Sequence, residues 1–144
     1  MYCTAEDIDG CIPKARLIEL TDDAEPSTGE INAEIIGKAI DDAAATIDAL
    51  IAGRYSLPLA SIPPILKKIS IDLSIYNLFA RHADSEEFKG ACKRHDNAMK
   101  LLQMIADGTV TLGIAEAEGK PGFFAKSYVE GGPAQFTMNS MRSL

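Results

Sequence analysis

The stretch IGKAIDDAAATIDAL, residues 36–50, decides the fold class. Its apolar positions recur at steps of four, three, four and three residues: Ile36, Ile40, Ala43, Ile47 and Leu50. Such steps place side chains on one face of an α-helix. The three aspartates of the stretch fall between these positions. The pattern therefore predicts a long amphipathic helix, with Gly53 as its C-terminal cap.

A second long helix is expected over residues 64–82, because Pro64 suits a first helical turn. This segment is apolar on most sides, as is typical of a helix at the centre of a bundle or in an interface. Residues 69–75 alternate between apolar and polar and could instead form a strand. We expect a helix, because the apolar run is too long for one strand and no hairpin partner follows.

Three further helices complete the predicted domain. A short one follows Thr4, and another begins at Pro13 and carries Leu17, Ile18 and Leu20. A longer one begins near residue 84 and ends at Gly108, with an apolar stripe that again steps by three and four: Phe88, Cys92, His95, Met99, Leu102 and Ala106. Residues 1–108 thus predict an all-α bundle of four to five helices.

Residues 109–144 differ in character, since five glycines and two prolines interrupt them. We expect an irregular C-terminal arm, with a short strand at 123–129 as an option within it. Its apolar residues suit docking on a neighbouring chain. The interface candidates in the arm are Phe123, Phe124, Tyr128, Phe136 and Met141. A terminal tail that never orders is the alternative.

The composition and charge of the chain argue for some classes of protein and against others. The chain has 144 residues, of which 47% are hydrophobic, enough for one domain with a proper core. We expect no membrane span and no secretory signal, so the cytoplasm is the expected location. The three cysteines show no disulfide spacing and are expected to be reduced. The net charge of −7 argues against a duplex-DNA binder, and the doublets Lys67-Lys68 and Lys93-Arg94 suit a solvated surface.

No catalytic or metal centre is predicted. Cys92 and His95 could supply two ligands of a zinc site, but no paired ligands accompany them, and both lie on the apolar stripe. Neither His82 nor His95 stands in a nucleophile motif, and no phosphate-binding glycine loop occurs. We therefore expect no cofactor, no metal and no enzymatic activity. A small enzyme with an acid–base pair that no motif marks is the weaker reading.

Charge is unevenly distributed along the chain. Residues 1–53 hold 3 basic and 12 acidic side chains, whereas residues 54–102 hold 8 basic and 5 acidic ones. Opposite patches of this kind suit the heterologous contacts of a ring, although chance and solubility explain the split equally well. Arg54 and Tyr55 are further interface candidates, since both residue types favour interfaces. A local contact at a helix end is the alternative for this pair.

Several stretches together resemble a known family. They include Met1-Tyr2-Cys3-Thr4, the segment Gly53-Arg54-Tyr55-Ser56-Leu57-Pro58-Leu59 with Pro63-Pro64 after it, and the C-terminal Phe136–Leu144. The chain resembles small proteins from the morphogenesis modules of Mu-like phages and prophages. The segment at 53–59 is its most specific part. Where this sequence has Met138-Asn139, the resemblance leads us to expect a charged residue.

The resemblance implies a helical head–tail connector, a neck or head-completion subunit that forms a ring between portal and tail-completion proteins. It implies a monomer in isolation as one state, no catalytic residues, no membrane and no sequence-specific nucleic acid. The virion neck, after assembly in the host cytoplasm, is the implied location. A non-virion assembly factor from the same gene cluster is the alternative.

Overall fold

The computed structural model describes residues 1–117, and over these residues the protein is all-α. The elements are α1 (Ala5–Asp9), α2 (Lys14–Thr21), α3 (Ala33–Ile51), α4 (Pro64–Phe79), the 3₁₀ turn η1 (Ala80–His82) and α5 (Glu86–Asp107). The expected all-α bundle is confirmed. No helix in this part of the chain is long and apolar enough to cross a membrane.

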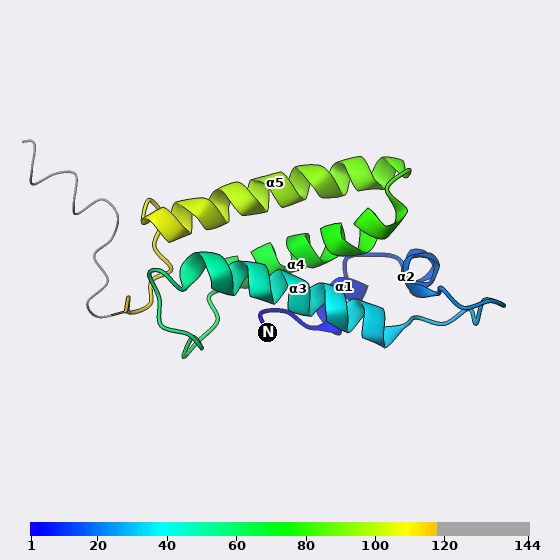
Figure 1. Cartoon of the computed structure of the whole chain (residues 1–144), viewed down its shortest axis with the longest axis horizontal. Helices are drawn as coiled ribbons and strands as arrows, with labels where there is room; N and C mark the ends of the chain where they lie inside the picture. Colours follow the sequence, from blue (N-terminus) through cyan, green and yellow to red (C-terminus); the bar gives the residue numbers. More distant parts are fainter. Residues whose placement is uncertain (118–144) are drawn as a thin grey trace, which may run out of the picture.

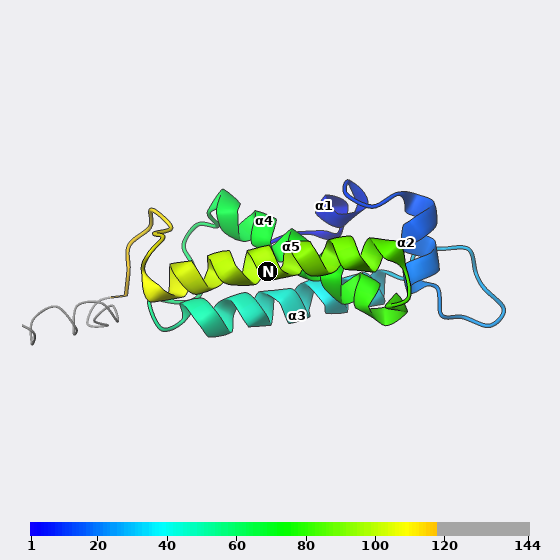
Figure 2. The same cartoon turned by 90° about the horizontal axis from the view of Figure 1, so that it is seen from above.

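The three long helices form an elongated bundle in which neighbours along the chain run in opposite directions (Figures 1 and 2). Helix α4 contacts both α3 and α5, and it also touches α1 and α2. The two short helices cover one end of the bundle, whereas the last described residues lie at the other end (Figure 1). Helix α4 is thus the central element, as its all-round apolar sequence predicted.

The core consists of two clusters that share α4. One lies towards the C-terminal ends of α3 and α5 and includes Ile47, Tyr55, Leu66 and Leu102. The other joins α1 and α2 to the opposite end and includes Leu17, Ile36 and Phe79, among others. The alternating run at 69–75 is helical, and its serines are buried together with its apolar residues. The hydroxyl of Ser74 donates to the carbonyl of Ser70 at 2.7 Å, which satisfies it inside the helix.

Side chains cap the start of both α3 and α5, but the two helices end differently. Asn32 caps α3 by accepting from the N–H groups of Glu34 and Ile35, and Ser85 caps α5 through Phe88. Gly108 ends α5 in the left-handed conformation, with φ of 91°. The prediction of Gly53 as the cap of α3 is wrong, because the C-cap is Ala52 in an ordinary right-handed conformation. The chain continues through a further turn, in which the Tyr55 N–H bonds the carbonyl of Ile51 at 2.9 Å.

The N-terminal segment lies across the bundle. The hydroxyl of Tyr2 donates to Asp48 of α3, and the buried thiol of Cys3 accepts from the Ser70 hydroxyl at 3.2 Å. An ion pair of 2.8 Å between Lys67 and Asp7 ties α1 to α4. The first residues therefore contact both core clusters.

Candidate functional site

A set of contacts fixes the chain after α5 against the end of α3, and we call it the arm latch. The buried hydroxyl of Tyr55 accepts the N–H of Leu112 at 3.1 Å. The Arg54 Nε donates to Glu116 Oε1 at 2.8 Å, and a second guanidinium nitrogen bonds the same oxygen. The N–H of Ala117 donates to the carbonyl of Arg54 at 3.0 Å. Three successive anchors thus hold residues 112–117 to one turn of chain.

Gly108 completes the arm latch because the Arg54 guanidinium occupies the space beside its Cα. A Cβ atom built on Gly108 would lie 1.7 Å from Arg54 Nη1. The hydrogen bonds to Glu116 raise the pKa of Arg54 above its ordinary value, so the guanidinium stays charged. Bonds from the backbone and hydroxyl of Thr109 lower the pKa of Asp107. The latch therefore combines a left-handed glycine, a buried phenol and an ion pair.

These contacts bear on two of the predicted interface residues. The side chains of Arg54 and Tyr55 bond Glu116 and Leu112 of their own chain, which lie beyond the end of α5. A contact of either residue with another subunit stays a prediction. The other five candidates, Phe123, Phe124, Tyr128, Phe136 and Met141, lie outside the described residues, as does the optional strand at 123–129. The described start of the arm, residues 109–117, lies on the bundle, and the boundary at residue 108 stays a prediction.

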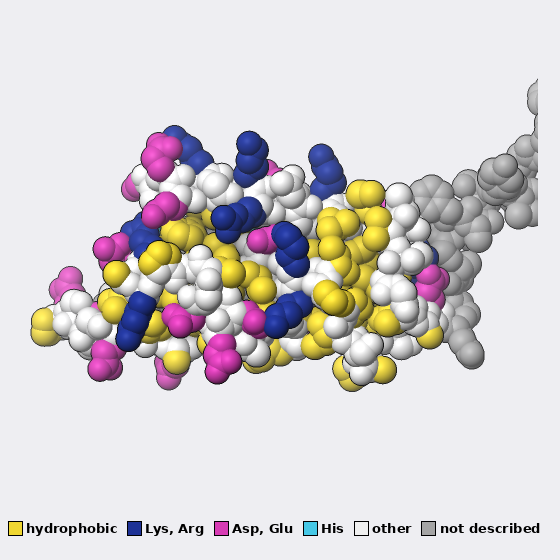
Figure 3. All heavy atoms as spheres, turned by 180° about the vertical axis from the view of Figure 1, so that it is seen from behind, with side chains coloured by type: hydrophobic (Ala, Val, Ile, Leu, Met, Phe, Trp, Pro, Cys, Tyr) yellow, Lys and Arg dark blue, Asp and Glu magenta, His cyan; other side chains and the backbone are white. Residues whose placement is uncertain are grey.

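Apolar side chains are exposed near the arm latch. Leu57 and Ile62 of the connector between α3 and α4 are 37% and 48% exposed. Leu59, Val110 and Ile114 are partly buried against the neighbouring core. Figure 3 shows hydrophobic side chains gathered right of centre on the visible face, whereas basic and acidic side chains are both spread over its left part. This end of the bundle therefore presents a mixed surface that suits contact with another chain.

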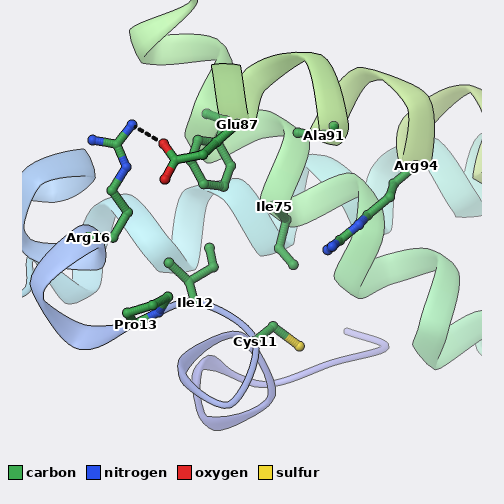
Figure 4. A pocket seen from close by; sticks show the side chains of 10 residues that line it. Cys11, Ile12, Pro13, Arg16, Ile75, Glu87, Ala91 and Arg94 are labelled. Atoms are coloured by element: carbon green, nitrogen blue, oxygen red, sulfur yellow. Dashed lines mark ion pairs between the residues drawn. The ribbon is translucent and has the colours of Figure 1, made fainter. Parts of the chain in front are cut away.

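A pocket of about 310 Å³ lies near the other end, between the α1–α2 corner, α4 and α5. Its floor is apolar and includes Ile12, Ile75 and Phe79. Gly90 and Ala91 of α5 have small side chains, which leaves the pocket open on that side. Figure 4 shows Glu87, Ala91 and Arg94 along α5, with Arg16 and Cys11 on the facing segments.

Charges of both signs stand around this pocket. Arg16 pairs with Glu87 at 2.7 Å and with Glu19 at 2.6 Å, and its guanidinium lies 5.7 Å from the centre of the Phe79 ring. The hydrogen bond to Glu19, first of all, raises the pKa of Arg16. The buried Nε of Arg16 has no hydrogen-bond partner among the described residues, and Arg94 has no ion pair there. Arg16 and Arg94 thus both have N–H groups without a partner within residues 1–117.

The histidine and cysteine residues considered for metal or nucleophilic chemistry have different surroundings in the described part of the chain. His95 lies 4.1 Å from the Tyr76 ring, centre to centre, and its Nδ1 contacts Asp96 at 3.2 Å. Cys3 is buried, Cys11 is exposed and Cys92 is half-buried. Within residues 1–117, no group of three or more histidine, cysteine and acidic side chains is arranged to hold a metal ion.

Over residues 1–117, the fold and its surfaces define a small all-α bundle protein in which residues 112–117 are anchored to one end. A family model described as Bacteriophage Mu, Gp36 matches residues 2–124, and the chain belongs to that family. The resemblance to Mu-like phage proteins is therefore confirmed. The family match ends at residue 124. It therefore does not include residues 136–144, which were part of the sequence pattern that resembles Mu-like phage proteins.

A curated relative is the Mu-like prophage FluMu protein gp36 of Haemophilus influenzae. It is 26% identical over 91 residues, which cover 63% of this chain and 62% of the relative. The matched part thus spans less than two thirds of that relative's length.

Proposed function

We propose that this protein is a structural subunit of the head–tail connector, or neck, of a Mu-like tailed phage or prophage. It acts by assembling into a ring and by docking on portal and tail-completion proteins. It assembles in the host cytoplasm and stays in the virion neck. The observation that carries the proposal is membership of the Mu phage family by a helical bundle whose C-terminal arm is anchored at one end.

The structure supports this role through its surfaces. A ring needs two different patches on each subunit that meet head to tail. The apolar end near the arm latch and the charged pocket near α2 lie at opposite ends of the bundle. Anchoring the arm at Arg54 and Tyr55 gives it a fixed point of departure, which reduces the entropy lost on docking.

We also propose that the protein performs no chemistry. Within residues 1–117, no hydrogen bond joins a cysteine thiol to a histidine ring, as a nucleophile and its base would require. Family membership in a phage morphogenesis group favours a role in assembly.

A non-virion assembly factor is the second candidate, favoured by the same surfaces, because a factor that leaves the particle also needs docking sites. Quantitative mass spectrometry of purified particles separates the two. A fixed copy number per virion, with cryo-electron microscopy density for the bundle at the neck, is expected for the connector. Presence in assembly intermediates and absence from mature particles would refute it.

A further inference from the structure

The pocket between the α1–α2 corner, α4 and α5 has a charge pattern along α5 that matches residues 126–130 of the sequence. Glu87, Gly90, Ala91 and Arg94 all line the pocket from α5. Their spacing of three, four and seven residues places them on one helix face. In order along α5, this face presents an acid, a gap made by two small residues, and a base. The distance from Glu87 to Arg94 along the axis is about 10 Å.

The arm carries the complementary order in the sequence Lys126-Ser127-Tyr128-Val129-Glu130. Residues two apart share a face of an extended peptide, so Lys126, Tyr128 and Glu130 would face the same way in such a peptide. Four residues of extended chain span about 13 Å, close to the span on α5 and within reach of long side chains. Among the aromatic residues of 118–144, Tyr128 alone has a base two positions before it and an acid two positions after it.

We propose that the 126–130 segment of a second copy of this chain docks in the pocket. Tyr128 enters opposite Gly90 and Ala91, Lys126 meets Glu87, and Glu130 meets Arg94. The Tyr128 hydroxyl gives the buried Nε of Arg16 the acceptor it lacks. A phenylalanine could fill the same space but could not accept that hydrogen bond.

We choose a second copy because the arm latch and the pocket lie at opposite ends of the bundle, and the nine residues from Ala117 to Lys126 would have to be almost fully extended, at about 3.3 Å each, to reach the pocket of their own chain. The arm leaves from the latch beside Arg54, whereas Ala91 lies 17 residues before Gly108 on α5, or about 25 Å along the helix. One end of a subunit thus gives an arm and the other receives one, which is a heterologous, head-to-tail contact. This inference rests on the proposed ring for its biological setting.

The test uses the full chain with Ser127→Cys and a short bismaleimide cross-linker, over a series of protein concentrations. Exposed Cys11 lines the pocket and supplies the second thiol. We expect a link between Cys11 and the thiol introduced at position 127. Adding Cys11→Ser should abolish it. With isotope-labelled and unlabelled protein mixed, linked peptides of mixed mass are expected. Links only within one copy, or none above the Cys11→Ser control, would overturn the proposal.

Charge reversal tests the pairing itself. Arg94→Glu should lower the initial cross-linking rate about fivefold, and adding Glu130→Arg should restore it. Lys100→Glu is the matched control, since it makes the same charge change on the exposed part of α5 outside the pocket. An equal loss with Lys100→Glu, or no recovery in the double variant, would contradict the pairing. Tyr128→Phe should also slow the reaction, and an unchanged rate would remove Arg16 from the contact.

The outcomes are separable from those for the proposed function. A specific intermolecular link in a protein that is absent from virions would leave the arm contact standing and refute the connector. A protein that is present at the neck but shows no cross-link would support the connector and refute the arm contact.

Discussion

Replacing Gly108 with alanine is expected to lower the free energy of unfolding by about 2 kcal/mol, through two separate effects. The first is conformational, because φ of 91° at Gly108 lies in the left-handed region. An L-residue held there loses about 1–2 kcal/mol. The second is steric, because the new Cβ would lie 1.7 Å from Arg54 Nη1.

The guanidinium is the flexible end of a long side chain, so it can move aside. Moving it breaks the bonds to Glu116. The Arg54 side chain is 13% exposed and that of Glu116 is 41% exposed, so the pair resembles a surface ion pair. Such pairs contribute about 0.2–1 kcal/mol. Most of the expected loss in unfolding free energy therefore comes from the backbone conformation of Gly108. A smaller part comes from the broken bonds between Arg54 and Glu116.

Urea denaturation followed by circular dichroism measures this loss, and Gly113→Ala separates its two parts. Gly113 also has a positive φ, of 71°, but nothing lies within 4 Å of an added Cβ. It should show the conformational effect alone. In an Arg54→Ala background, Gly108→Ala should cost no more than Gly113→Ala does. An equal loss for both glycine variants in the wild-type background would refute the steric contact with Arg54.

Three further predictions concern single groups. Tyr55→Phe leaves the N–H of Leu112 unsatisfied in the core and should cost about 1–2 kcal/mol in urea denaturation; no loss would remove the phenol from the latch. Burial, and then its carboxylate partner, raises the pKa of Tyr2 above the ordinary value of 10, so the folded state holds this proton more tightly. Stability should therefore fall as pH rises above about 10, and Tyr2→Phe should remove part of that fall. The Ser27 hydroxyl, with backbone N–H groups, lowers the pKa of Asp22 to about 2; Ser27→Ala should raise it in an NMR titration, and an unchanged midpoint would exclude the hydroxyl.

Helical periodicity predicted most of the fold. The stripe from Ile36 to Leu50 is on a helix whose buried face includes Ile36, Ile40, Ala43 and Ile47. The apolar run after Pro64 is the central helix. Gly53 was wrongly predicted as the cap of α3, because a glycine directly after an apolar stripe commonly ends a helix. Here the chain makes one more turn beyond Ile51, so that Tyr55 can enter the core, and this depends on tertiary packing.

The arm latch was only partly predictable. Arg54 and Tyr55 stand out in the sequence as residue types that favour interfaces. Their partners Leu112 and Glu116 are more than 50 positions away along the chain. Local sequence carries no signal for such a pairing. The pocket was missed for a related reason, since its α5 face becomes meaningful only when the α1–α2 corner closes over it. The spacing of Glu87, Gly90, Ala91 and Arg94 was the available signal.

Helix α5 connects the pocket to the arm latch, and its length therefore fixes the distance between the two sites. It has 22 residues and spans about 33 Å, with pocket residues in its first half and Gly108 directly after its last. Inserting one residue between them would lengthen the helix by about 1.5 Å and rotate one site relative to the other by about 100°. Insertions in the connector at 56–63, after the latch residues Arg54 and Tyr55, would change neither quantity. Homologous chains that assemble in the same way should therefore vary in length at that connector and keep α5 at constant length between its two sites.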